Sequence, residues 1–492
     1  MENTIYELFQ NMVRNHKKKP AIIENNRTLT YGELSDLTDM IAATFPKDII
    51  SVGIVMNHRA EMIAAILAVL KCGGRYVPAE PSFPTGRIRY MMEEAQVDFI
   101  LTEKECEDRL HGFSLRLTDC EICGSETSIS NSTKELTPEL PAYVLYTSGT
   151  TGRPKGICVT NSNVCHYVRA FQNEFHLTEK DIMLQYSVCS FDIFVEEVFA
   201  SLLNGAAIAI PSEEDKADVC SLMRFVDRQE VTVISAFPYL LAEMNHLPAI
   251  PSSLRLLISG GDVLRGVYVD HLVEQAEVYN TYGPSETTVC ASYYHCNDGT
   301  VLEDGTYPIG SAVKGSRICI LDADGNEVPT GETGEICIYG RGVSLGYVGS
   351  HEEENKAFEI QQDGHRMYRS GDLGYILPDG NIAFLHRKDT QIMIYGKRVE
   401  VSEVESHLYQ CQSVQQAIVR SFTDEDGLAY MTAYVVPADR DIKVSAVRDE
   451  LAKNLTSFMI PEFFVKMPSI PLNTNGKPDM AKLPIVLKAG NL

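Results

Sequence analysis

The sequence has no apolar run long enough to span a lipid bilayer. Its longest such stretch, near Met62–Leu70, is far shorter than the roughly 20 residues that a transmembrane helix needs. The segment Met1–Pro20 places apolar residues at helical spacing among charges and has no uninterrupted apolar core. It therefore predicts an amphipathic helix and not a signal peptide. We expect a soluble, cytoplasmic protein.

Positive charge is scarce. The 492 residues include 43 Lys and Arg against 67 Asp and Glu, a formal net charge of −24. This balance opposes binding to nucleic acid or to an anionic membrane, so neither is expected as a partner. The 13 cysteines are scattered and odd in number, which fits reduced thiols better than a disulfide framework. Cys120 and Cys123 lack the second ligand pair of a structural zinc site.

Strand-like apolar runs alternate with helical patterns through most of the N-terminal part of the chain. Ile49–Val55 is followed by Arg59–Leu70, and Val231–Ser235 by Tyr239–Asn245. Such alternation predicts an α/β architecture with largely parallel sheets. From about Gly305 to Leu385, short alternating strands separated by turn residues predict an antiparallel or barrel-like section.

The pattern changes again after Arg387 and predicts a compact α+β module. We place the domain boundary at Lys388–Asp389. The expected elements are a helix over Ser402–Gln410, strands over Ala417–Ser421 and Ala429–Val436, and a helix over Val444–Leu455.

A loop rich in glycine and hydroxyl side chains carries the strongest local signal. An apolar strand, Tyr143–Tyr146, runs into a loop that ends in Lys155. Glycines let backbone N–H groups approach phosphate oxygens, hydroxyls add donors, and lysine adds positive charge. The loop lacks the Gly-Lys-[Ser/Thr] spacing of a Walker A motif, so it predicts a phosphate site of another kind.

Ten short motifs follow one another along nearly the whole chain. They are LTYGEL (29–34), LKCGGRYVP (70–78), LYTSGTTGRPKG (145–156), FD (191–192), NTYGPSETT (280–288), GEICI (334–338), YRSGDL (368–373), HRKDTQ (386–391), FMIP (458–461) and NGK (475–477). With these motifs the chain resembles acyl- and aminoacyl-adenylate-forming enzymes. Among them it is most similar to adenylation domains of nonribosomal peptide synthetases and to D-alanine–carrier-protein ligases.

The resemblance implies a fold and a reaction. The fold would have a large N-terminal domain, residues 1–388, with two α/β subdomains and a distorted β-barrel, and a small mobile α+β domain, residues 389–492. In the reaction a substrate carboxylate attacks the α-phosphate of ATP, and pyrophosphate leaves. Both reactants are anionic, so the site must gather positive charge, including Mg²⁺, and hold them in line.

The resemblance assigns nucleotide-binding roles. Glu286 is the expected magnesium ligand, Tyr282 would stack on adenine, and Asp372 would accept hydrogen bonds from the ribose hydroxyls. Asn280 would read the exocyclic amine, and Arg387 would add a ribose contact. The expected phosphate-binding residues are Thr147, Ser148, Gly149, Thr150, Thr151, Gly152 and Lys155, and the other expected ATP contacts are Gly260, Gly261, Thr281, Gly283, Pro284 and Ser285.

Three C-terminal positions have expected roles in catalysis and transfer. Lys477 would reach the substrate carboxylate and the α-phosphate and neutralise charge in the transition state. Asp389 would be the hinge of a rotation that withdraws Lys477 and presents Gly396 beside a tunnel for a phosphopantetheine thiol. Tyr395 stands where many relatives have Arg, and His386 where most have Gly.

Two carboxylates indicate the class of substrate. Asp192 matches the aspartate that amino-acid-activating members keep for the α-ammonium group, and Glu196 lies one helical turn further on. A buried carboxylate needs a proton or a cation, so we expect a basic substrate, lysine first and ornithine second. In the alternative, Glu196 pairs with a protein side chain or faces solvent. The other expected pocket residues are Ile193, Ser235, Ile258, Gly260, Thr281, Val289 and Cys290.

Other functions stay open. The alternatives are a D-alanine–carrier ligase, an acyl-CoA ligase and an inactive nucleotide- or carrier-binding module. The methyl side chain of D-alanine would offer no cation to Glu196, and an acyl substrate would have no ammonium group for Asp192 to bind. An inactive module would have no need of Lys477. The chain has no phosphopantetheine-attachment signature and no condensation domain. We therefore expect a freestanding enzyme that aminoacylates a carrier protein in trans. A single domain excised from a longer synthetase would have the same sequence, so that alternative stays open.

Overall fold

The computed structural model divides the chain into two units, which we describe separately. One comprises Met1–Pro81, Met92–Leu145 and Gly156–Lys388, and the other Ser82–Met91, Tyr146–Lys155 and Asp389–Leu492. Two segments that the sequence boundary assigns to the N-terminal domain thus group with the C-terminal residues. The residues described are 3–107, 110, 116–119, 135–148, 153–388, 391–424, 427–438, 442–471 and 480–488.

A nine-stranded sheet forms much of the first unit. Its order is β15-β14-β13-β12-β11-β9-β10-β1-β2, and the strands from β13 to β1 pair in parallel. The strands are β1 (Pro20–Glu24), β2 (Arg27–Thr30), β9 (Ile182–Leu184), β10 (Ala207–Ala209), β11 (Val233–Ala236), β12 (Leu256–Ser259), β13 (Glu277–Tyr282), β14 (Ser292–His295) and β15 (Ser311–Ala312).

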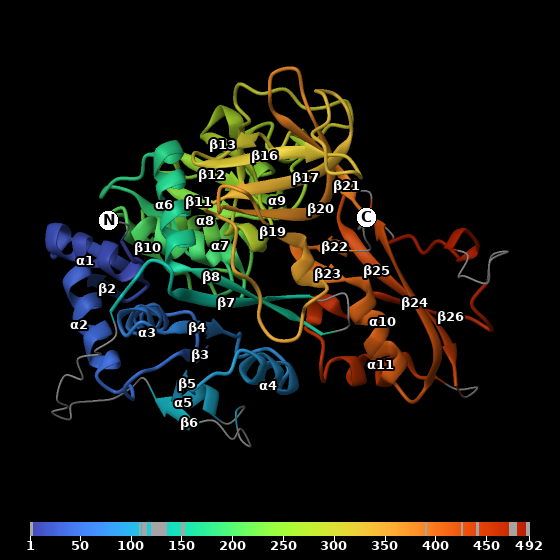
Figure 1. Ribbon diagram of the computed structural model, residues 1–492, viewed down its shortest axis with the longest axis horizontal. Helices are drawn as coiled ribbons and strands as arrows, with labels where there is room; N and C mark the ends of the chain where they lie inside the picture. The colour runs from blue at the N-terminus through green and yellow to red at the C-terminus, as the bar shows by residue number, and fades with distance from the viewer. Residues whose placement is uncertain are drawn as a thin grey trace. The chain divides into compact units, whose positions relative to one another are not determined.

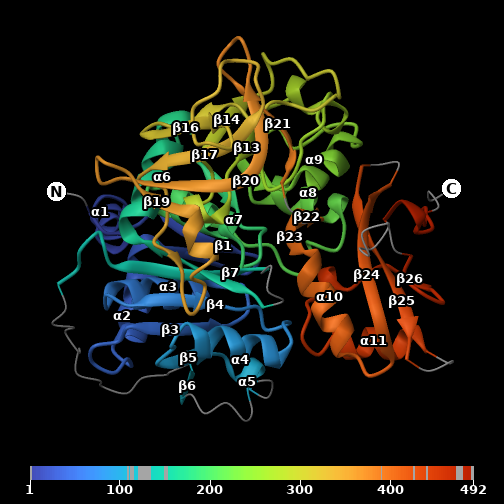
Figure 2. The ribbon, with the colours of Figure 1, turned by 45° about the vertical axis from the view of Figure 1, so that its right-hand side comes forward.

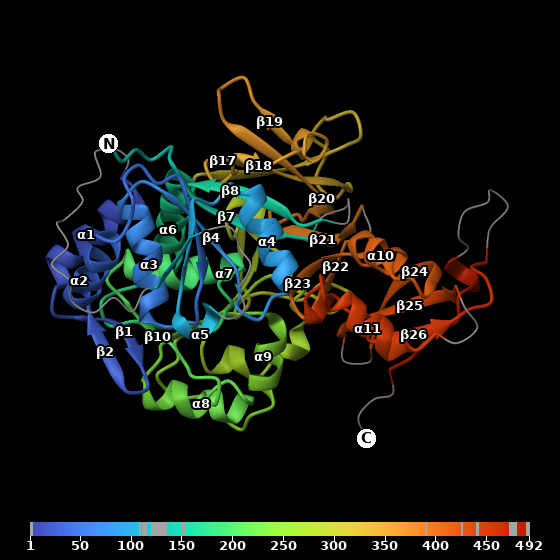
Figure 3. The same cartoon turned by 90° about the horizontal axis from the view of Figure 1, so that it is seen from below.

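Helices cover this sheet. On one face α8 (Val219–Arg228) and α9 (Pro238–Asn245) lie side by side, as Figure 3 shows. Phe225 and Leu241 from these helices share one apolar core with Ile234 of β11. This arrangement fits the predicted strand–helix alternation, because a parallel strand must be followed by a crossover that returns the chain to the same edge.

A seven-stranded sheet completes the α/β part, in the order β18-β8-β7-β4-β3-β5-β6, with β7 through β6 parallel. Its strands are β3 (Ser51–Val55), β4 (Arg75–Pro78), β5 (Phe99–Thr102), β6 (Arg116–Asp119), β7 (Pro141–Thr147), β8 (Lys155–Thr160) and β18 (Gly346–Tyr347). All of β3 is buried, and so is most of α3 (Ala60–Lys71), as expected for a parallel sheet covered by helices. The predicted α/β class is confirmed.

The section expected to be antiparallel forms a five-stranded sheet. Its order is β16-β17-β20-β19, and β21 also pairs with β20; all these pairs are antiparallel. The strands are β16 (Ser316–Leu321), β17 (Gly334–Gly340), β19 (Phe358–Ile360), β20 (Arg366–Ile376) and β21 (Ile382–Arg387).

The second unit contains the predicted α+β module. Its helices α10 (Val401–Gln410) and α11 (Val444–Leu451) share one apolar core with a three-stranded sheet (Figure 2). The sheet has the order β24 (Val414–Thr423), β25 (Ala429–Pro437) and β26 (Phe463–Lys466), beside a separate hairpin of β22 (Gln391–Ile394) and β23 (Lys397–Glu400). A short helix, α4 (Thr85–Glu94), adds the buried ion pair Arg87–Glu403 at 2.8 Å.

Local sequence signals explain where helices begin. Thr4 and Glu7 form a capping box at the start of α1 (Ile5–His16), and Thr30 and Glu33 do the same for α2 (Tyr31–Ala42), the neighbouring helices drawn in blue in Figure 1. Within the described residues we find no helix with the length and apolarity needed to cross a membrane. The cysteines in this part of the chain are all free thiols.

Candidate active site

The segment after β9 carries carboxylates into the interior of the first unit. Asp192 begins the short helix α7 (Asp192–Val195), and the chain continues into a π-helical turn, η2 (Glu196–Ala200). Glu196 and Glu197 are 1% and 0% exposed, so two adjacent carboxylates are removed from water. Such turns occur often at functional sites.

Glu197 is satisfied by the protein. It accepts hydrogen bonds from the backbone N–H groups of Tyr186 and Ser187, at 3.1 and 3.0 Å, and from the side-chain amide of Gln185 at 3.0 Å. Burial still raises the pKa of Glu197 to about 7. Because both of its oxygens accept hydrogen bonds from the protein, we interpret Glu197 as a structural residue that needs no ligand.

Glu196 is satisfied only in part. Its Oε2 accepts a short hydrogen bond from the Tyr167 hydroxyl of α6 (Asn161–Phe175), whereas Oε1 is buried with no hydrogen-bond partner in the described part of the chain. Burial raises the pKa of Glu196 to about 7, the Ser235 and Tyr167 hydroxyls oppose this rise, and the charge of Asp192 adds to it. One carboxylate oxygen therefore remains for a cationic ligand.

Asp192 lies close to a third carboxylate. Burial raises the pKa of Asp192 to about 6, a hydrogen bond with Ser285 opposes this rise, and the charge of Glu286 adds to it. A positively charged group bound here would relieve the repulsion between the carboxylates.

Three of the remaining expected pocket residues, Ser235, Ile258 and Thr281, lie near the carboxyl ends of neighbouring strands, where parallel sheets commonly bind ligands. Ser235 of β11 is paired in register with Ile258 of β12, and both are buried. Burial raises the pKa of the Cys290 thiol, the charge of Glu196 adds to this rise, and a hydrogen bond with Thr281 opposes it. Ile193 and Val289 are also buried.

Two glycines allow close packing at these strand ends. A Cβ atom on Gly283 would lie 2.5 Å from the backbone oxygen of Val289, and one on Gly260 would lie 2.7 Å from Oγ1 of Thr281. Gly260 therefore makes room for the Thr281 side chain. Thr288 and Val289 have φ values of +64° and +68°, a strained conformation for β-branched residues that is typical of functional sites.

Asp372 is the centre of the expected ribose site. Its Oδ1 accepts a hydrogen bond from Arg387 Nη1 and its Oδ2 accepts one from the Tyr282 hydroxyl, both at 2.5 Å. Asp372 on β20 is paired in register with Arg387 on β21, so the antiparallel sheet brings acid and base together. The sequence indicated all three residues but not these bonds among them.

Asn280 and Glu286 are also held by the protein. The Asn280 side-chain amide donates to the backbone oxygen of Pro308 at 2.8 Å, which leaves its carbonyl end as the acceptor that an exocyclic amine requires. Glu286 is fully buried, and its Oε1 accepts a hydrogen bond from the Tyr347 hydroxyl at 2.5 Å. A buried carboxylate beside phosphates suits Mg²⁺, which typically takes one or two carboxylates and substrate oxygens.

The described ends of the phosphate loop, residues 146–148 and 153–155, belong to the second unit. Most of the flanking strands β7 and β8 belongs to the first unit. Thr147 ends β7 with a buried hydroxyl that has no hydrogen-bond partner within the described residues, as a phosphate donor would require. Ser148 donates to the backbone oxygen of Arg398 at 2.9 Å, and Lys155 is buried at the start of β8. The predicted phosphate ligands Gly149, Thr150, Thr151 and Gly152 lie outside the described residues.

The C-terminal candidates are described only in part. Lys477 and the proposed hinge Asp389 lie outside the described residues, as do Cys120 and Cys123. Gly396 forms the turn between β22 and β23 with Tyr395, and their φ values of +72° and +50° are those of a two-residue hairpin turn.

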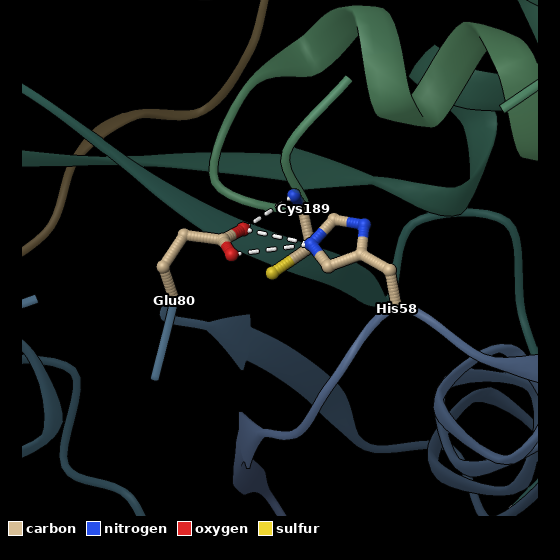
Figure 4. Close-up of side chains that lie close together, drawn as sticks. All are labelled: His58, Glu80 and Cys189. Carbon is tan, nitrogen blue, oxygen red and sulfur yellow. Dashed lines mark hydrogen bonds and ion pairs between the residues drawn. The ribbon is translucent and has the colours of Figure 1, made fainter. Parts of the chain in front are cut away.

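A group that sequence reasoning missed contacts the segment before Asp192. Figure 4 shows His58, Glu80 and Cys189, whose ligand atoms lie within 4.8 Å of one another. Glu80 lies 3.1 and 3.2 Å from His58 Nε2 and accepts from the Cys189 backbone N–H at 2.7 Å. Burial alone would raise the pKa of Glu80, but the bonds from His58 and Cys189 lower it.

This group fixes the backbone three residues before Asp192. The available signal in the sequence was position: His58 and Glu80 each follow a strand, β3 and β4, that are neighbours in a parallel sheet. Because both His58 and the Cys189 N–H already engage Glu80, we interpret the group as a clamp on the Cys189 segment and not as an empty metal site.

Comparisons with known proteins place the chain among its relatives. The AMP-binding enzyme family matches residues 9–348, and the AMP-binding enzyme C-terminal domain matches residues 403–477. Bacitracin synthase 2 of Bacillus licheniformis is 35% identical over 98% of this chain, which spans 18% of that relative.

Two solved structures share the fold. The adenylation domain AlmE of Vibrio cholerae, in complex with glycyl-adenosine-5′-phosphate, has a TM-score of 0.84 at 23% identity over 96% of each chain. An artificially fused adenylation–PCP di-domain of Klebsiella oxytoca, NpsA-ThdA, has a TM-score of 0.84 at 22% identity over 94% of this chain and 93% of that one.

Proposed function

The chain belongs to the AMP-binding enzyme family, and from this premise we propose that it is a ligase that activates an amino acid. The substrate carboxylate attacks the α-phosphate of ATP, an aminoacyl-AMP forms, and pyrophosphate leaves. The aminoacyl group then passes to the phosphopantetheine thiol of a carrier protein. The fused adenylation–PCP structure with the same fold supports a partner of this kind.

Groups on β13, β20 and β21 hold the adenosine part of the nucleotide. We assign adenine stacking to Tyr282 and amine recognition to Asn280, and we assign the ribose hydroxyls to Asp372, whose orientation Arg387 fixes. Mg²⁺ at Glu286 would neutralise charge on the phosphates. Thr147, Lys155 and Lys477 would add donors and positive charge as the α-phosphate is attacked.

The substrate proposal rests on one observation: Oε1 of the fully buried Glu196 has no hydrogen-bond partner in the described part of the chain. We assign the substrate's α-ammonium group to Asp192 and its side-chain ammonium to Glu196. A bound cation favours the charged form of a carboxyl whose pKa burial has raised, so binding and ionisation support each other. This favours lysine, with ornithine next.

A panel of amino acids in the ATP–pyrophosphate exchange assay tests the proposal. We expect magnesium-dependent exchange that is strongest with lysine or ornithine. Strongest exchange with alanine or leucine would contradict the basic substrate and leave adenylation intact. If no amino acid supports exchange and no aminoacyl-AMP forms, the proposed activity itself is wrong.

The second half-reaction needs its own test. Purified enzyme with ATP, the best amino acid of the panel and a separately purified holo carrier protein should yield an aminoacyl thioester, detected by mass spectrometry of the intact carrier. The apo carrier, which lacks the thiol, is the matched control. A thioester that forms on neither carrier would contradict transfer in trans.

A further inference from the structure

Two buried tyrosines outside the expected pocket positions lie next to Glu196. We propose that Tyr167, assisted by Tyr293, makes this end of the amino-acid site select a primary ammonium group over a guanidinium group. The inference rests on the proposed function and names the class of basic side chain that Glu196 receives. It assigns Tyr167 as a residue that determines specificity through the carboxylate it holds.

The two oxygens of the Glu196 carboxylate differ in their partners. Tyr167 is 2% exposed, and its hydroxyl donates to Oε2 of Glu196. Oε1 has no hydrogen-bond partner within the described residues. Only one carboxylate oxygen is therefore open to the substrate, and its neighbour is held by a rigid aromatic side chain.

A single open oxygen restricts which cation the carboxylate can bind. A guanidinium group binds a carboxylate best through two parallel N–H···O bonds, which need both oxygens. An ammonium group is a compact charge whose three N–H bonds can go to separate acceptors. With Oε2 of Glu196 engaged by Tyr167, the site offers the geometry of an ammonium partner.

A second acceptor for the ammonium group is the hydroxyl of Tyr293. Tyr293 of β14 has a buried hydroxyl with no hydrogen-bond partner in the described part of the chain. Burial raises the pKa of the Tyr293 hydroxyl, the charges of Cys290 and Glu196 add to this rise, and the Tyr167 hydroxyl opposes it. These influences indicate that the Tyr293 hydroxyl lies near both Glu196 and Tyr167. Oε1 of Glu196 can accept one N–H of the substrate's ammonium group, and the Tyr293 oxygen can accept another.

The test compares lysine with arginine in ATP–pyrophosphate exchange for the parent enzyme and for Tyr167→Phe. The parent enzyme should prefer lysine by at least about 10-fold in kcat/KM. Loss of a hydrogen bond to a charged group should lower lysine activation by about 10- to 100-fold. Arginine should lose less, because Oε2 becomes available, so the preference for lysine should shrink by about 10-fold.

Tyr293→Phe is a second variant in case Tyr167→Phe folds poorly, and it should lower lysine activation by several-fold with arginine little changed. Tyr31→Phe is the matched control, because Tyr31 is equally buried and its hydroxyl donates to the backbone oxygens of Leu202 and Ala206. It should leave the lysine-to-arginine ratio unchanged. Thermal melts check the folding of each variant.

The outcomes separate this inference from the proposed function. If the parent enzyme activates lysine but Tyr167→Phe and Tyr293→Phe lower both substrates by the same factor, the tyrosines only support the fold and the inference is overturned. A parent enzyme that prefers arginine also overturns it, while the basic substrate class stands. A parent enzyme that activates only neutral amino acids overturns the substrate class itself.

Discussion

Two regions of the first unit each contain a buried carboxylate, and they differ in how many of its oxygens accept hydrogen bonds from the protein. In the proposed ribose region both oxygens of Asp372 accept hydrogen bonds from protein donors, Arg387 and Tyr282. In the proposed amino-acid region Glu196 has one oxygen held by Tyr167 and one with no partner within the described residues. The protein itself satisfies the first carboxylate, whereas under the proposed function the substrate completes the second.

This difference has a physical meaning. A site for a ligand common to every turnover gains from polar groups that already hold one another in place. A site that must choose among similar side chains gains from a buried polar group that only the right partner satisfies, because a wrong substrate leaves that group unpaired. The adjacent pair Glu196 and Glu197 repeats the contrast within one helical turn.

The largest effect is expected in the ribose region. Asp372→Ala removes the acceptor of two charge-assisted bonds and the expected ribose ligand, so exchange should fall about 1000-fold with every amino acid tested. The measurement is kcat/KM for ATP in the exchange assay. Asp181→Ala, which breaks a 2.7 Å pair with Arg255, is the control and should change stability more than exchange. A loss confined to basic substrates would contradict the ribose assignment.

In the amino-acid region, Glu196→Gln should act on selectivity. Lysine activation should fall about 100-fold, because the ammonium loses its counter-charge, while the KM for ATP changes little. Glu197→Gln is the matched control, since Glu197 is as buried but is satisfied by the protein. Equal loss of lysine selectivity in both variants would contradict the proposal that Glu196, and not Glu197, pairs with the substrate's ammonium group.

The clamp before Asp192 should have an intermediate effect. Glu80→Gln weakens the bonds to His58 and to the Cys189 N–H, so the KM for the amino acid should rise about 10-fold through Asp192 while the KM for ATP is unchanged. Glu103→Gln, which disturbs a 3.0 Å pair with Arg59, is the control. If both variants only lower the melting temperature, the clamp has no role in substrate positioning.

The smallest effect is expected from pH. Glu196 has a pKa raised to about 7, so it is largely protonated below pH 7 and ionised above it. Because the cation needs the ionised form, kcat/KM for lysine should rise about threefold between pH 6.5 and 7.5. The same rise should be absent in Glu196→Gln. An activity that falls with pH over this range would oppose the assignment.

Part of the fold was readable in the sequence because its signals are local. Alternating strand and helix patterns predicted the parallel sheets, and Ser402–Gln410 predicted a helix found at Val401–Gln410. The change of pattern near Gly305 predicted the antiparallel section. The helix expected over Val444–Leu455 ends at Leu451, which shows how little periodicity says about helix ends.

The sequence by itself determined the family and predicted which residue types meet the ligands, because the motifs place chemistry at fixed positions along the chain. Tertiary structure alone decided which of those groups remain unsatisfied. Tyr167 and Glu196 are 29 residues apart, and Asp372 meets Arg387 only through strand register. Hydrogen-bond satisfaction depends on how distant elements pack, and no local pattern encodes that.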